Sequence, residues 1–150
     1  MTEILATSVD KFTFKVPTDR YYNAEGLWVL VEQAGIVRLG LGDFLQQSSG
    51  DVAFAEVKPA GALLEAGQPF ASIETIKATL ELESPVPGTV LEVNPLLVSR
   101  PEVINQDPYG DGWLARVQVR DWEAVSSGLL EPRHYFKLMK DRAEEEAGKS

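Results

Sequence analysis

The sequence predicts a mainly β domain, a sandwich or barrel-like sandwich that carries one short helix and one helix near the C-terminus. Short runs of β-branched and aromatic residues recur along the chain, and turn residues separate them at close intervals. Strong helix formers gather only beyond about residue 121. The 150 residues are therefore expected to form one domain, with a core over about 20–120 and a helical extension over about 121–147.

The first half of the chain shows apolar alternation broken by Gly and Pro. It predicts an edge strand at 12–16, a hairpin of 27–32 with 36–40, and a strand at 51–57. Between them, Asp43 is expected to N-cap a short helix over about 43–48, because its carboxylate can accept an unpaired backbone N–H of the first turn.

The second half continues as strands up to a long loop. Strands are expected at 69–74, 79–83, 88–94 and 113–119, and the loop 95–112 is expected to contain one helical turn around 101–105. The segment 131–146 carries helix formers and an apolar stripe, which predicts the C-terminal helix. The residues expected to fill the core are Trp28, Val37, Phe54, Phe70, Ile73, Val90, Val93 and Trp113.

Composition excludes several classes of function. A formal net charge of -9 disfavours nucleic acid and anionic membranes, whose main attraction is to Lys and Arg. The chain has no Cys, which excludes disulfides, cysteine metal sites and thiol nucleophiles. The start has no basic segment followed by an apolar run, and no stretch is long and apolar enough to span a membrane. These features favour a cytoplasmic protein.

Lys77 stands between two predicted strands that leave room only for a short turn. It is therefore expected at or beside a hairpin tip, where it protrudes from a packed β domain. Most hairpin lysines are simply solvated. A lysine that a modifying enzyme must reach, and that must carry an arm from a fixed base, needs this same setting.

Four motifs, in order along the chain around this lysine, match those of a known protein family. They are Glu74-Thr75-Ile76-Lys77-Ala78, Ser84-Pro85-Val86-Pro87-Gly88, Gly50-Asp51-Val52, and the run Asn105-Gln106-Asp107-Pro108-Tyr109-Gly110-Asp111-Gly112-Trp113. They resemble the E-S-V-K-A, S-P-V-x-G, G-D-V and N-x-D-P-Y-G-x-G-W motifs of the H protein family of the glycine cleavage system, over about residues 27–119. The chain is similar in this way to the wider biotinyl/lipoyl carriers, whose fold is a barrel-sandwich hybrid.

The resemblance implies a carrier and not an enzyme. Lipoic acid would be bound through an amide to Lys77, and a lipoate-attaching enzyme would add it. In this family the lipoyl arm accepts an aminomethyl group from a decarboxylase (glycine decarboxylase), delivers it to an aminomethyltransferase, and is reoxidised by a dihydrolipoyl dehydrogenase. Glu74, three residues before the lysine, is expected to help the attaching enzyme recognise the hairpin.

The chain departs from the family pattern at three places. Gly26-Leu27 stands where the family has His-Glu before Trp-Val, Leu80 and Glu83 replace a small polar residue and an aromatic, and both ends are longer. These departures keep an alternative open: an H-like lipoate-binding protein that carries sulfur intermediates for a heterodisulfide-reductase-like sulfur oxidation system.

Three further classes fit the residues less well. Biotinyl carriers usually place their lysine between methionines, whereas Ile76 and Ala78 flank Lys77. The chain has no Cys/His pair, metal-ligand cluster, P-loop or G-x-G-x-x-G spacing, which disfavours an enzyme. The presence of Lys77 disfavours a carrier-like domain that has lost its attachment site.

Overall fold

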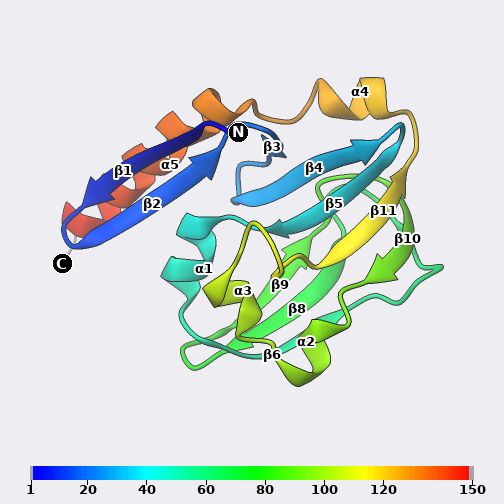
Figure 1. Cartoon of the computed structure of the whole chain (residues 1–150), viewed down its shortest axis with the longest axis horizontal. Helices are drawn as coiled ribbons and strands as arrows, with labels where there is room; N and C mark the ends of the chain where they lie inside the picture. Colours follow the sequence, from blue (N-terminus) through cyan, green and yellow to red (C-terminus); the bar gives the residue numbers. More distant parts are fainter. Residues whose placement is uncertain (1, 149–150) are drawn as a thin grey trace.

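The computed structural model describes residues 2–148. Within these residues, three antiparallel sheets form the framework, and five helices pack around them (Figure 1). A six-stranded sheet contains, in spatial order, β3 (Tyr21–Tyr22), β4 (Leu27–Gln33), β5 (Ile36–Leu41), β11 (Ala115–Val119), β10 (Gly88–Val93) and β7 (Leu63–Leu64). A three-stranded sheet is formed by β6 (Val52–Val57), β8 (Pro69–Thr75) and β9 (Thr79–Glu83), and a separate hairpin by β1 (Ile4–Val9) and β2 (Phe12–Pro17).

The main core lies between the six-stranded and three-stranded sheets. Val37 and Val117 of the larger sheet belong to the same buried cluster as Phe70 and Ile73 of the smaller one. Because each sheet buries one apolar face against the other, the architecture is the mainly β sandwich that the alternating pattern predicts. The predicted hairpins and strands are present, with β4 pairing β5 and β8 pairing β9.

The helices follow the predictions, with two additional short helices. α1 (Asp43–Ser49) and α5 (Pro132–Gly148) lie where the sequence predicts them, and α4 (Trp122–Ser126) precedes α5. The loop 95–112 contains two helical turns, α2 (Leu96–Ser99) and α3 (Val103–Gln106), where one was expected. No helix within residues 2–148 is long and apolar enough to cross a membrane.

The prediction that Phe54 fills the core is wrong. Its side chain is 50% exposed, whereas Val52 is buried. A β-bulge lies between Val52 and Phe54 in the pairing of β6 with β8. An extra residue in one strand reverses which side chains face the core, so the simple alternation of this segment gives the wrong side after the bulge. The other residues predicted for the core are buried or half-buried.

The prediction that Asp43 caps α1 is also wrong. Gly42 is the N-cap residue, and no side chain caps the helix. The Asp43 carboxylate instead accepts hydrogen bonds from the Lys15 backbone N–H at 2.9 Å and from the amides of Gln46 and Gln47. It therefore joins α1 to the N-terminal hairpin, a long-range role that a local capping rule does not predict.

A second apolar cluster joins the two ends of the chain. Phe14 and Val16 of β2 pack with Tyr135 and Met139 of α5, and Trp28 lies in the same cluster. The rings of Tyr22 and Tyr135 stack with centroids 4.6 Å apart. The hairpin β1–β2 and α5 consequently lie side by side along one flank of the sandwich (Figure 1).

Candidate functional site

The site is centred on the three-residue turn Ile76-Lys77-Ala78 that joins β8 to β9. Thr75 closes this turn with backbone and side chain together. Its N–H donates to the Ala78 carbonyl at 2.8 Å, and its hydroxyl accepts the N–H groups of Lys77 and Ala78 at 3.2 and 3.1 Å. The turn is thus held by the hydroxyl residue just before it, and Lys77 is exposed at the tip.

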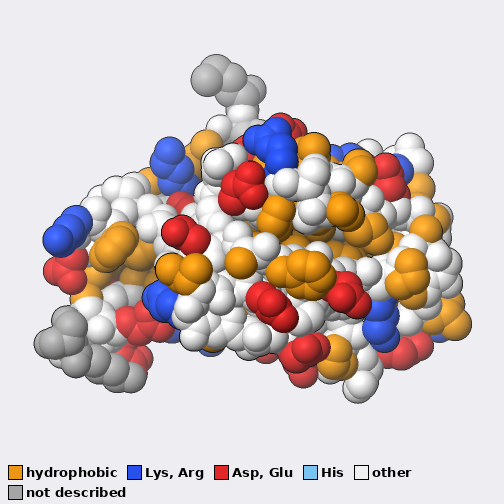
Figure 2. Space-filling model, turned by 90° about the horizontal axis from the view of Figure 1, so that it is seen from below, with side chains coloured by type: hydrophobic (Ala, Val, Ile, Leu, Met, Phe, Trp, Pro, Cys, Tyr) orange, Lys and Arg blue, Asp and Glu red, His pale blue; other side chains and the backbone are white. Residues whose placement is uncertain are grey.

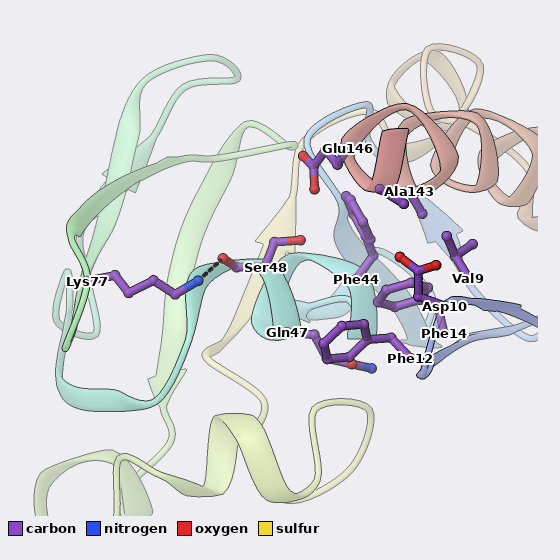
Figure 3. Close-up of a pocket in the computed structure, with 11 residues that line it drawn as sticks. Val9, Asp10, Phe12, Phe14, Phe44, Gln47, Ser48, Lys77, Ala143 and Glu146 are labelled. Atoms are coloured by element: carbon purple, nitrogen blue, oxygen red, sulfur yellow. Dashed lines mark hydrogen bonds between the residues drawn. The ribbon is translucent and has the colours of Figure 1, made fainter. Parts of the chain in front are cut away.

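A short backbone segment, residues 48–51, lies beside the tip and is called the shelf below. The Ile76 N–H donates to the Asp51 carbonyl at 3.2 Å, and the Lys77 ammonium donates to the Ser48 carbonyl at 3.2 Å. The shelf therefore contacts both the backbone of the turn and the end of the lysine side chain. Figure 3 shows Lys77 extended across this gap toward Ser48.

Position 50 in the shelf favours glycine for two reasons, its backbone conformation and the closeness of the Lys77 side chain. Its φ is +90°, a left-handed conformation that L side chains rarely adopt. A Cβ at this position would also lie 3.0 Å from Cε of Lys77, so the lysine stem passes directly over the glycine. The glycine of the Gly50-Asp51-Val52 motif noted in the sequence is thus the residue over which the lysine stem lies.

Asn105 ties the shelf to the core. Its side-chain N–H₂ donates to the Gly50 carbonyl and to Oε1 of Gln46, both at 3.0 Å, and its Oδ1 accepts the Val52 N–H at 2.8 Å. Gln46 is buried and donates in turn to Asp43. One amide side chain thereby fixes α1, the shelf and the start of β6 together.

The loop 105–112 packs against the same region. The Tyr109 hydroxyl donates to the Lys15 carbonyl at 2.6 Å and accepts the Asp43 N–H at 2.9 Å. Burial raises the pKa of Tyr109 above its usual value, so the hydroxyl stays protonated and remains a donor. Asn94 holds the far end of the loop by donating to the carbonyls of Asp111 and Trp113, both at 2.7 Å.

An apolar groove of about 400 Å³ opens beside Lys77. Its walls come from the hairpin β1–β2, from α1 and from the last turns of α5; Figure 3 shows the rings of Phe12, Phe14 and Phe44 gathered in it. The carboxylates of Asp10 and Glu146 also line it. One end of the groove is therefore apolar and partly acidic, and Lys77 lies at the other.

Glu74 lies on β8 with its side chain exposed, next to Phe54 and Thr79 in the strand pairing. Other exposed acidic residues of this sheet are Glu56, Glu81 and Glu83. Figure 2, which views the molecule from below, shows acidic and apolar side chains interspersed across this side. The structure thus places Glu74 on an acidic face close to the lysine turn. No hydrogen bond or ion pair joins Glu74 to Lys77 in the part of the chain that the structure describes.

The departures from the family pattern have different structural settings. Gly26, at the place of the early histidine, has a φ of +100°, and a Cβ there would lie 3.0 Å from the Tyr135 hydroxyl and 3.3 Å from Cβ of Leu45. Leu27 is buried in the main core, and Leu80 is half-buried and packs against that core. Glu83 is exposed. α1 and α5 therefore occupy the space that a side chain at position 26 needs.

The fold and the site together define a carrier-type domain: a β sandwich that presents one lysine on a braced hairpin tip. The family model described as "Glycine cleavage H-protein" matches residues 20–142. The chain belongs to the glycine cleavage H-protein family. This membership confirms the resemblance seen in the sequence and the expectation of a non-catalytic carrier.

Individual relatives agree with the family assignment. A glycine cleavage system H protein of Carboxydothermus hydrogenoformans is 39% identical over 86% of this chain and 98% of its own length. One from Mycobacterium avium is 43% identical over 76% of this chain and 86% of its own. The crystal structure of a glycine cleavage system H protein from Mycobacterium marinum superposes with a TM-score of 0.70, at 31% identity, over 81% of this chain and 97% of that one. These relatives give no support to the alternative of a sulfur carrier.

Proposed function

We propose that this chain is the lipoyl carrier of a glycine cleavage system and that lipoic acid is attached by an amide to Lys77. The observation that supports this most is the single exposed lysine at the tip of a turn closed by Thr75 and braced by the shelf. Attachment replaces a charged ammonium by a neutral amide with a single N–H, which would weaken the hydrogen bond from Lys77 to the Ser48 carbonyl and make it easier to release the arm.

The residues around Lys77 fit a lipoyl group. The groove beside it offers the aromatic rings of Phe12, Phe14 and Phe44 to an arm that ends in an apolar dithiolane. When bound, the group would supply the disulfide/dithiol couple that carries the aminomethyl cargo. The chain itself would hold the arm's base in place and present it to successive enzymes, which raises the effective concentration of the arm at each one.

The proposed partners are the lipoate-attaching enzyme and, after attachment, glycine decarboxylase, aminomethyltransferase and dihydrolipoyl dehydrogenase. The acidic face beside the hairpin, which includes Glu81, suits basic docking surfaces on the three enzymes that would act after attachment. The proposal includes a monomeric carrier acting in the cytoplasm, because one arm must visit several enzymes in turn.

An intact mass with peptide mapping, on protein purified from its native host, tests the attachment. We expect one lipoyl increment, confined to the peptide that contains Lys77. An unmodified Lys77 in a host whose other lipoyl proteins are loaded would refute the proposed function. Biotin in place of lipoate would give a different increment and a band on a streptavidin blot.

Glu74 is proposed as the recognition residue for the attaching enzyme. We expect Glu74→Ala to lower the rate of lipoylation by about 10- to 150-fold, because a charge-assisted hydrogen bond to the enzyme is worth roughly 1.5–3 kcal/mol. The measurement is a time course of lipoyl incorporation by mass spectrometry. Glu81→Ala, on the neighbouring strand of the same sheet, is the matched control and should leave the rate unchanged. An unaltered rate for Glu74→Ala would exclude this role.

A further inference from the structure

We propose that Asn105 is the residue that positions Lys77 for attachment, by holding the shelf under the hairpin tip. The inference rests on the proposed function, in that Lys77 is taken as the attachment site. Asn105 does not touch the lysine. It would act through residues 48–51, which do.

The contacts of Asn105 enclose the shelf from both sides. Its N–H₂ group donates to Gln46 before the shelf and to Gly50 within it, while its Oδ1 accepts the N–H of Val52 directly after it. Three hydrogen bonds from one side chain thus fix seven consecutive residues, 46–52. A segment tied at both ends and in the middle has few alternative conformations.

The shelf in turn fixes the hairpin tip. Its Asp51 carbonyl accepts the N–H of Ile76, its Ser48 carbonyl accepts the lysine ammonium, and the stem of Lys77 lies over its Gly50. The hydrogen bond between Ile76 and Asp51 joins the tip to the body of the protein at the residue next to Lys77. Releasing the shelf would therefore release the base of the lysine.

Removal of the Asn105 donors has a defined local cost. Oε1 of the buried Gln46 and the Gly50 carbonyl would each lose their partner, and an unpaired buried acceptor favours local rearrangement. The residues that move most easily are those of the shelf, because they are exposed or half-buried and lie outside the main core. The expected effect is thus a displaced lysine on an otherwise folded domain.

Asn105→Asp is the first test variant, because it keeps the shape and the acceptor oxygen but removes both donors. We expect enzymatic lipoylation to slow about tenfold, and amide exchange at Ile76 to accelerate by a similar factor. Acylation of Lys77 by a small reagent that needs no docking should stay within about twofold of wild type. Asn105→Ala is the second variant. It should slow lipoylation and accelerate amide exchange at Ile76 in the same way, and it adds no charge.

Asn94→Asp is the matched control. Asn94 also donates two side-chain hydrogen bonds and accepts one, from Leu96, but it serves the far end of the loop 105–112. Denaturation midpoints measured for all variants show whether their stabilities are comparable. The Asn94→Asp protein should be lipoylated at the wild-type rate, even if it loses as much stability as Asn105→Asp.

Two results would overturn the positioning role. One is a wild-type lipoylation rate in a folded Asn105 variant, and the other is equal slowing in the Asn94 control. Should wild-type Lys77 receive no lipoyl group, the proposed function fails instead. Amide exchange at Ile76 then still decides the inference, since unchanged exchange in Asn105→Asp would refute it.

Discussion

Lys77→Arg is expected to abolish carrier function completely. Arg keeps the positive charge at the hairpin tip, but its guanidinium remains protonated and cannot form the amide. We therefore expect no lipoyl increment in the intact mass and no measurable aminomethyl transfer in a system reconstituted with the three proposed partner enzymes. The loss should exceed that of any other single substitution in the domain that leaves it folded.

The control for Lys77→Arg is Lys58→Arg, a second exposed lysine in the turn after β6. This variant should be lipoylated and active like the wild type. The fold of Lys77→Arg should also be unaltered, because the side chain is exposed and the turn is closed by Thr75. Carrier activity in a Lys77→Arg protein without any lipoyl group would exclude a covalent arm as the basis of function.

Trp28→Ala is expected to lower the free energy of unfolding by about 3–5 kcal/mol. The ring is fully buried, and Gly40 packs so closely on it that a Cβ there would lie 2.4 Å from the ring. The indole N–H donates to the carbonyls of Leu41 and Pro108, which would lose this donor. Because domains of this size are stable by roughly 5–15 kcal/mol, the variant should unfold at a much lower urea concentration.

Trp122→Ala serves as the control for the loss of a tryptophan. Trp122 is half-buried and meets Tyr21 edge to face, with ring centroids 5.6 Å apart. Its removal should cost about 1 kcal/mol. A urea midpoint for Trp28→Ala no lower than that of the control would show that the second apolar cluster contributes little to stability.

Local patterns in the sequence predict most of the β framework correctly. Alternation and turn residues identify the hairpin β4–β5 and the strands on either side of Lys77, because those signals act over a few residues. Local reasoning fails where a distant contact decides. The bulge that turns Phe54 outward depends on how β6 pairs with β8, and Asp43 bonds to Lys15 from another element.

The candidate site shows the same division. The lysine and its place in a turn follow from the sequence, and the motifs that contain Gly50 and Asn105 are visible there. The hydrogen bond between these two residues cannot be predicted from the sequence, because Asn105 and Gly50 stand 55 positions apart and meet only in the folded domain. The hydroxyl of Thr75 is the one bracing group that a local rule for Ser and Thr in turns would have identified.

The distance along the chain between the shelf and Asn105 has a consequence for the order of events during synthesis. The hairpin with Lys77 leaves the ribosome before Asn105 does, since the chain emerges from its N-terminus. Until residue 105 is available, the hydrogen bonds to Gln46, Gly50 and Val52 cannot form. A nascent chain would thus display the lysine on an untethered turn, and enzymatic attachment would begin only once the later half of the domain had been translated and had closed on the earlier one.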